Sequence, residues 1–173
     1  LTGFKWIADM IRRAEGQEEF VGGGEESFGF MVGDFVRDKD SITTTILACE
    51  VASVAKAKGS SFFQELLKIY QKTGMYRESL VNIVREGVSG AQQIKAMMDT
   101  LRENPLKTID GSPVVRIDDY KTSISKDLTT GTQTPIQIPK SDVLIYYTAD
   151  GTKIAARPSG TEPKIKFYFG VKG

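Results

Sequence analysis

The sequence has no histidine and a single cysteine, Cys49, among its 173 residues. Without histidine there is no Ser-His-Asp or Cys-His pair, no imidazole general base and no histidine-rich metal site. A lone cysteine cannot form an internal disulfide, which favours a reducing compartment, so we expect a cytoplasmic protein. Any chemistry must use carboxylates, lysines, arginines, hydroxyl groups and backbone amides.

Long apolar runs and an excess of one charge are missing as well. No run of about 18 apolar residues is present, so we expect no membrane span, and we expect no signal peptide. The formal net charge is +1, which argues against a nucleic-acid partner because phosphates select a basic surface. The content of 40% hydrophobic and 26% charged residues is that of a globular protein with one domain or two small ones.

Helices dominate the first part of the chain. The spacing of Phe4, Ile7 and Ile11 predicts a helix with Thr2 as its N-cap. We expect the aromatic pair Phe62-Phe63 to lie in the core because each ring would bury a large apolar area. The predicted elements are helices over 2–14, 38–58 and 61–74 and a short strand over 18–21.

The second part of the chain contains most of the strand signals, and Thr, Ser, Pro and β-branched residues dominate after Pro105. Ser89 and Gln92 form a capping box that predicts a helix start, and Asp150-Gly151 predicts a hairpin. The predicted elements are strands over 75–86, 114–117, 143–147, 153–156 and 164–172 and a helix over 89–104. We therefore predict an α/β part over 1–74 and an α+β part, an antiparallel sheet with a helix, over 75–173.

The first candidate site is the glycine-rich loop Gly22–Gly29. It lacks the lysine of a phosphate-binding P-loop, and Ser27 replaces the last glycine of a GxGxxG pattern. Residues 15–27 contain five glutamates and no cation, which repels phosphate but suits sugar hydroxyls that donate to carboxylate oxygens. The alternative is a solvated turn with surface glutamates.

The second candidate site is the loop Arg157–Pro163, between two predicted strands. Arg157 offers a planar donor fork that matches a phosphate. Ser159 and Thr161 offer hydroxyls, and Gly160 lets a ligand approach the backbone. The alternative is a tight β-turn with incidental polar residues.

Upstream, the segment Arg37–Asp40 is typical of a helix start, at which an aspartate caps the helix while Lys39 points into a site.

Together these segments resemble the C-terminal half of the α-D-phosphohexomutases, the phosphoglucomutase/phosphomannomutase family. The resemblance rests on the order and spacing of four motifs and covers essentially the whole chain. They are Thr2-Gly3-Phe4-Lys5, Gly24-Glu25-Glu26-Ser27-Phe28-Gly29, Arg37-Asp38-Lys39-Asp40 and Arg157-Pro158-Ser159-Gly160-Thr161-Glu162-Pro163. The form of the second motif looks more like the phosphoglucomutase branch.

The resemblance implies a fold and a reaction. Residues 1–74 would be the latter part of the family's third domain, a three-layer α/β domain, and 75–173 its fourth domain without the last helix. Family members interconvert hexose 1-phosphate and hexose 6-phosphate through a phosphoserine and a bisphosphate intermediate, glucose 1,6-bisphosphate for glucose. The implied sugar contacts are Glu25, Ser27 and Lys39, and the implied phosphate contacts are Arg157, Ser159, Gly160 and Thr161.

Two family features are missing from the sequence: the loop with the phosphorylated serine and the aspartate-rich loop that binds Mg²⁺. The resemblance therefore implies a fragment whose catalytic serine, Mg²⁺ site and N-terminal domains lie outside it, and which binds hexose phosphate without turning it over. The alternatives are a stand-alone, non-catalytic sugar-phosphate-binding module and a structural domain whose loops bind nothing.

Overall fold

The computed structural model describes residues 3–25 and 28–173 and divides the chain into two compact units. Unit 1 is Leu1–Ile69 and unit 2 is Tyr70–Gly173, so the division falls inside one helix. Each unit is described by itself.

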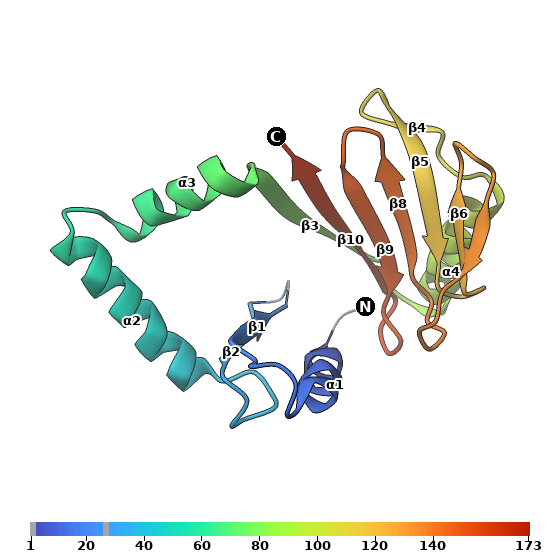
Figure 1. Ribbon diagram of the computed structural model, residues 1–173. Coiled ribbons are helices and arrows are strands. Elements are labelled where there is room, and N and C mark those ends of the chain that lie inside the picture. The colour runs from blue at the N-terminus through green and yellow to red at the C-terminus, as the bar shows by residue number, and fades with distance from the viewer. Residues whose placement is uncertain (1–2, 26–27) are drawn as a thin grey trace. The chain divides into compact units, whose positions relative to one another are not determined.

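Unit 1 combines helices with a small antiparallel hairpin (Figure 1). In the hairpin, Gly22 pairs with Val32 and Gly24 with Phe30, and the second strand contacts the long helix that follows. The elements, with a last helix that continues into unit 2, are α1 (Phe4–Ala14), β1 (Gly22–Gly24), β2 (Phe30–Val32), α2 (Ser41–Ala57) and α3 (Phe62–Thr73).

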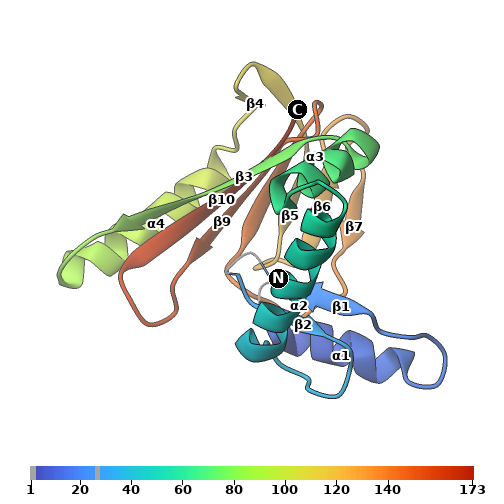
Figure 2. The same cartoon turned by 90° about the vertical axis from the view of Figure 1, so that its left-hand side faces the viewer.

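Unit 2 is built around one large antiparallel sheet with the strand order β3-β10-β9-β8-β5-β6-β7, and β4 pairs with β5. One helix, α4, contacts β9 and β10 and lies along one face of the sheet (Figures 1 and 2). The elements are β3 (Tyr76–Val84), α4 (Val88–Glu103), β4 (Thr108–Ile109), β5 (Ser112–Asp119), β6 (Ile124–Asp127), β7 (Gln133–Pro135), β8 (Leu144–Thr148), β9 (Lys153–Pro158) and β10 (Lys164–Lys172).

The core of unit 2 lies between α4 and the sheet. Ile94 and Met98 of α4 pack against strand residues whose side chains point to the same face, because side chains alternate along a strand. Leu144 is 1% exposed and Ile165 is fully buried. The cluster is Ile94, Met98, Val114, Leu144, Tyr146, Ala156 and Ile165.

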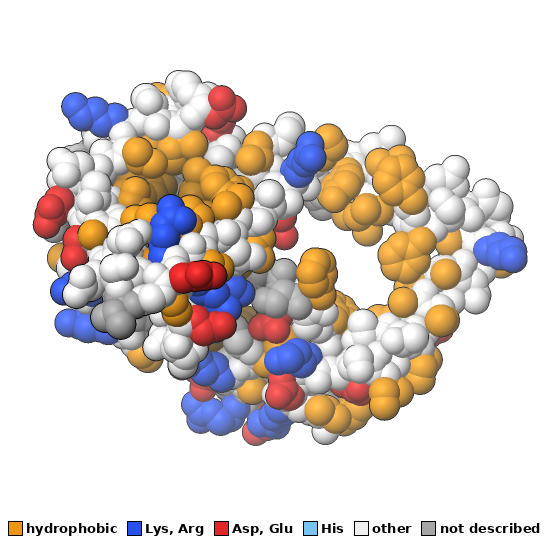
Figure 3. Space-filling view, turned by 180° about the vertical axis from the view of Figure 1, so that it is seen from behind, with side chains coloured by type: hydrophobic (Ala, Val, Ile, Leu, Met, Phe, Trp, Pro, Cys, Tyr) orange, Lys and Arg blue, Asp and Glu red, His pale blue; other side chains and the backbone are white. Residues whose placement is uncertain are grey.

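Unit 1 has a smaller core of Phe4, Ile11 and Met31, with Ile7 and Phe20 packed against it. Apolar side chains on α2 and α3 stay exposed, and Figure 3 shows them along these helices. Phe62 is 53% exposed and Phe63 is 64% exposed. The expectation that this pair lies in the core is therefore wrong for the described residues, since nothing in the described part of unit 1 covers α3.

The predicted order of elements, a helix-rich part followed by an antiparallel sheet with one helix, is confirmed. The helix over 38–58 is found as α2, and Gly59, with φ of 66°, ends it as predicted. There the amide of Ser60 donates to the carbonyl of Ala55, which satisfies an orphan acceptor of the last turn. The predicted strands over 75–86 and 164–172 are β3 and β10, which pair along their whole length.

Three local predictions are wrong or fall outside the described residues. The strand expected over 18–21 lies at Gly22–Gly24, where Phe30–Val32 supplies its pairing partner. The capping box at Ser89 does not form, because α4 already begins at Val88 behind Gly87, whose φ is 77°. Thr2, the expected N-cap of α1, lies outside the described residues. In residues 3–25 and 28–173, no helix is both long and apolar enough to cross a membrane.

Candidate functional site

The hairpin of unit 1 places two of the predicted sugar contacts side by side. The amide of Glu25 donates to the carbonyl of Gly29 at 2.9 Å, which continues the β1–β2 ladder into the loop. The Glu25 side chain is 14% exposed, and Lys39 Nζ lies 3.9 Å from its Oε1. Ser27, the third predicted contact, lies outside the described residues.

Gly29 explains why these side chains can gather. A Cβ at this position would lie 2.7 Å from Glu25 Oε1, 2.8 Å from the Phe4 ring and 2.9 Å from Lys39 Cδ. Such distances are too short for a real side chain, so only glycine leaves room for all three neighbours. Lys39 Nζ also lies 5.4 Å from the centre of the Phe4 ring, within the range of a cation–π contact.

The segment Arg37–Asp40 both starts a helix and supplies cations to the acidic loop. Asp40 is the N-cap of α2: its carboxylate accepts from the Ile42 amide at 2.9 Å and from the Thr43 hydroxyl at 2.7 Å. The Thr43 hydroxyl and then the Ile42 amide lower the pKa of Asp40. Arg37 forms an ion pair with Glu15. Two of the glutamates of 15–27, Glu15 and Glu25, thus lie beside cations from the segment before α2, which the sequence around them does not reveal.

The loop of unit 2 connects β9 to β10 and is held by its own backbone. The Ser159 amide donates to the Lys164 carbonyl at 2.8 Å. The Ser159 hydroxyl accepts from the amides of Thr161 and Glu162, at 3.4 and 3.2 Å, and so closes the turn while it keeps its own proton to donate. A Cβ on Gly160 would have no neighbour within 4 Å, so this position is open to a ligand.

The two sides of this loop differ. Ala156 and Ile165 belong to the core under α4, so strand alternation directs the next residues, Arg157 and Lys166, to the other face of the sheet. These two cations are directly paired residues of β9 and β10. Like charges in such a pair destabilise a sheet, and a bound anion would relieve their repulsion.

A hollow of about 370 Å³ lies at the loop on the side of α4. Its wall includes three of the predicted phosphate contacts, Arg157, Ser159 and Gly160, but not Thr161. The helix adds Lys95 and the segment before β8 adds Ser141, neither of which stood out in the sequence. The full lining is Ala91, Ile94, Lys95, Ser141, Asp142, Val143, Arg157, Pro158, Ser159, Gly160, Glu162 and Pro163.

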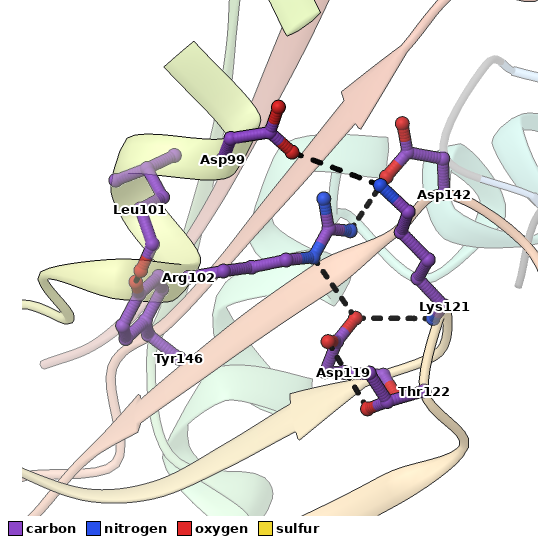
Figure 4. A network of polar contacts seen from close by, with 8 residues as sticks. All are labelled: Asp99, Leu101, Arg102, Asp119, Lys121, Thr122, Asp142 and Tyr146. Carbon is purple, nitrogen blue, oxygen red and sulfur yellow. Dashed lines mark hydrogen bonds and ion pairs between the residues drawn. The ribbon is translucent and has the colours of Figure 1, made fainter. Parts of the chain in front are cut away.

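A buried arginine fixes the segment before β8 (Figure 4). Arg102 of α4, with a side chain 14% exposed, lies 2.5 Å from Asp142 and 3.2 Å from Asp119. Burial by itself lowers the pKa of Arg102. The contacts with Asp142 and Asp119 raise this pKa by more, so the net shift is upward and the guanidinium stays charged. The side chain thereby ties α4 to the end of β5 and to the wall of the hollow.

The described residues do not fit a metal centre. No group of three or more Cys, Asp or Glu side chains in residues 3–25 and 28–173 could hold an ion. A Mg²⁺ ion of the kind that the family resemblance implies would need ligands from elsewhere.

Comparisons of the sequence and of the fold both lead to phosphoglucomutases. Residues 1–70 match the family model for phosphoglucomutase/phosphomannomutase, alpha/beta/alpha domain III. A phosphoglucomutase of Staphylococcus haemolyticus is 40% identical over 171 residues, which cover 99% of this chain and 31% of that protein. A phosphoglucomutase of Staphylococcus aureus is 41% identical over 172 residues, with the same coverage.

A solved structure shares the fold. It is the open form of the exocytosis-sensitive phosphoprotein pp63/parafusin, a phosphoglucomutase of Paramecium. The TM-score is 0.60 at 17% identity, and the match covers 99% of this chain and 28% of that one.

The chain is thus a helix-rich α/β unit followed by an antiparallel sheet unit of the phosphoglucomutase type. Over nearly its whole length it is similar to a segment of the phosphoglucomutases, and residues 1–70 match the domain III model of the phosphoglucomutase/phosphomannomutase family. It spans about a third of the length of the curated relatives that it matches.

Proposed function

We propose that this segment holds the sugar phosphate in a phosphoglucomutase, an isomerase that exchanges a phosphoryl group between the C1 and C6 oxygens of a hexose. Unit 1 is the latter part of the three-layer third domain and binds sugar hydroxyls through Glu25, Ser27 and Lys39. Unit 2 is the fourth domain and binds the phosphate that does not react through Arg157, Ser159, Gly160 and Thr161.

The observation that carries the proposal is the contrast in charge between the two loops. Glu25 is largely buried beside Lys39 and presents acceptor oxygens, which suit hydroxyl donors. Arg157 and Lys166 face each other across β9 and β10 and present donors only, which suit phosphate. The names of the relatives favour glucose over mannose as the hexose.

The segment supplies binding and orientation, not the transfer itself. Covalent phosphoryl transfer needs a nucleophile that carries the phosphoryl group and a positive charge that offsets the charge developing on it. In the proposed whole enzyme a serine and Mg²⁺ outside this segment fill these roles, and glucose 1,6-bisphosphate is the intermediate. A cytoplasmic location follows from the reduced state expected for Cys49.

A titration of the purified chain with glucose 1-phosphate, followed by amide chemical shifts, tests the proposal. We expect shifts at Arg157–Thr161 and at Glu25, and no interconversion of glucose 1-phosphate and glucose 6-phosphate when Mg²⁺ and the bisphosphate are added. Absence of shifts at both loops would show that they bind nothing. Turnover by a sample free of contaminating mutase would instead place the machinery inside the segment.

The stand-alone sugar-phosphate-binding module remains the alternative. The length of the relatives, about three times that of the match, favours a segment of a longer enzyme. The reading frame upstream of Leu1 decides between them: a serine loop and an aspartate-rich metal loop there support the segment, and a start codon just upstream supports the module.

A further inference from the structure

Phe28, in the loop Gly22–Gly29, has an unfavourable backbone conformation and an unfavourable environment at once. Its φ is 67°, in the left-handed region that glycine and asparagine occupy most easily and that bulky residues rarely adopt. Its side chain is 99% exposed, and the core of unit 1 is formed by other residues. Packing within the described part of unit 1 therefore does not account for this phenylalanine.

The turn that carries Phe28 is held by its neighbours. The amide of Glu25 donates to the carbonyl of Gly29 at 2.9 Å and closes the turn. Gly29 lies so close to the Phe4 ring that a Cβ there would be 2.8 Å from it. Left-handed backbone at residues other than glycine is typical of sites that clamp a ligand. A glycine at position 28 would avoid both the strain and the exposed ring, so the ring itself is the feature that needs a partner.

The same turn presents an acceptor beside the ring. Glu25 is 14% exposed and lies next to Lys39, and under the proposed function its carboxylate accepts from sugar hydroxyls. A pyranose carries hydroxyls around its rim and C–H bonds on its faces, so a carboxylate and an aromatic ring bind different parts of one sugar. Small-molecule sites combine aromatic walls with a few polar groups in this way.

We propose that Phe28 is a specificity-determining residue whose ring packs against one face of the hexose, a role that rests on the proposed function. In α-D-glucose 1-phosphate the axial phosphate occupies one face of the sugar. The opposite face carries the axial C–H bonds at C2 and C4, and the ring of Phe28 covers this face. In mannose the C2 hydroxyl is axial on that same face, so the ring would strip it of water without offering it a partner.

Isotope-filtered NMR on the whole 173-residue chain tests the contact directly. With a labelled chain and unlabelled α-D-glucose 1-phosphate, we expect nuclear Overhauser effects from the ring protons of Phe28 to H2 and H4 of the sugar. Effects to H3 and H5 in their place, or none from this ring, would overturn the proposal.

The variant Phe28→Gly separates the ring from the backbone. Glycine adopts the left-handed conformation freely, so the stability against urea should not fall. Binding of glucose 1-phosphate should weaken about 5- to 20-fold because part of the apolar area of the ring is lost from the contact, and binding of inorganic phosphate should not change. Phe28→Tyr keeps the ring and should stay within about twofold of the wild type. The matched control is Phe63→Ala, which removes a ring that is 64% exposed on α3 and should also stay within about twofold.

The two epimers distinguish recognition of the sugar face from a structural role. In Phe28→Gly the preference for glucose 1-phosphate over mannose 1-phosphate should fall about 3- to 10-fold, whereas a ring that only shapes the loop would weaken both ligands equally. Equal losses, or unchanged affinity for glucose 1-phosphate while Glu25 still shifts, would overturn the role of Phe28 alone. A wild-type chain in which glucose 1-phosphate shifts neither Glu25 nor Arg157–Thr161 would overturn the proposed function and the role of Phe28 with it.

Discussion

The two candidate loops are constructed in opposite ways. In unit 1 the loop joins a strand of three glycines to Phe30–Val32, and Phe4 and Lys39, from other parts of the sequence, lie against Gly29. In unit 2 the loop joins two long paired strands, and its own Ser159 closes the turn. The loop of unit 1 therefore depends on residues far away in the sequence for its charge, whereas the loop of unit 2 carries its donors within itself.

The two units also differ in the size of their hydrophobic cores. Unit 2 buries a cluster that runs from α4 through strands β5, β8, β9 and β10. The main buried cluster in the described part of unit 1 is Phe4, Ile11 and Met31, while Ile46 on α2 is 62% exposed. Hydrophobic burial is the main favourable term in folding, so unit 2 carries more of its own stability.

The largest expected effect contrasts one buried and one exposed side chain. Leu144→Ala should destabilise unit 2 by about 2–5 kcal/mol, because it removes buried methyl groups and leaves a cavity. Ile46→Ala should change the stability of unit 1 by no more than about 0.5 kcal/mol. Urea unfolding followed by amide signals, which resolve the units residue by residue, measures both.

The Ile46→Ala variant is the stricter test of this comparison. If Ile46→Ala cost as much as Leu144→Ala, the outer face of α2 would be covered in solution, and the contrast between the cores would disappear. A Leu144→Ala loss below about 1 kcal/mol would mean that the core of unit 2 collapses around the gap.

The second prediction contrasts the ligand specificity of the loops in the whole enzyme. Arg157→Ala removes a charge-assisted donor, so binding of every phosphate ligand should weaken about 10- to 100-fold, which corresponds to about 1.5–3 kcal/mol. Glu25→Gln keeps the shape but replaces one acceptor oxygen by a donor, and should weaken sugar phosphates without changing the binding of inorganic phosphate. Calorimetric titrations with glucose 1-phosphate and with inorganic phosphate measure the difference.

Either variant can contradict the proposed assignment of one loop to the phosphate and the other to the sugar. An unchanged KM and kcat in Arg157→Ala would remove Arg157 from the phosphate site. If Glu25→Gln tightened inorganic phosphate as much as it weakened glucose 1-phosphate, Glu25 would act as a general repulsive charge, and the loop of unit 1 would not be a sugar loop.

Helices and strands with a periodic apolar pattern could be predicted from the sequence. Strands that form only because another strand pairs with them could not. The alternation along 164–172 predicted β10, and Ile165 and Phe167 of its apolar face lie in or against the core of unit 2. Strands β6 and β7 were missed, since their short segments Ile124–Asp127 and Gln133–Pro135 have no alternation of apolar and polar residues in the sequence. Gly22–Gly24 has no side chains to show a period at all, so its strand exists only through pairing with Phe30–Val32.

The residues of the candidate sites divide in the same way, into local motifs that could be predicted and contacts between distant segments that could not. The motif around Arg157 could be recognised because its residues are contiguous and its turn is local. The approach of Lys39 to Glu25 is a contact between separate segments that Gly29 makes possible, and no local pattern marks it. Lys95 and Ser141 line the same hollow only because α4 packs on the sheet, and a lone lysine and a lone serine carry no sequence signal.

The smallest expected effect concerns the acid sensitivity of one turn in each unit. Asp127 of unit 2 accepts from the Thr129 hydroxyl at 2.6 Å and from the amides of Thr130 and Thr129 at 2.9 and 2.8 Å. These bonds lower the pKa of Asp127 from the ordinary value of 3.8 to about 2. In unit 1, Asp40 has the same kind of partners, the Thr43 hydroxyl and the Ile42 amide, and its pKa is lowered too.

The sign of the pH dependence follows from these directions. A carboxyl group whose pKa is lower in the folded chain stabilises it fully above the unfolded pKa, and the contribution is lost as pH falls through the folded pKa. For Asp127 that window runs from about pH 4 down to about pH 2. Carboxyl carbon shifts recorded across it should place the midpoint of Asp127 near 2 and that of Asp40 below 3.8. Asp127→Asn should unfold at lower urea than the wild type at pH 5, and the difference should shrink towards pH 2. A midpoint of Asp127 at its ordinary value would mean that the turn after β6 does not hold its three hydrogen bonds in solution, and that unit 2 is less well ordered there than the helix start of unit 1.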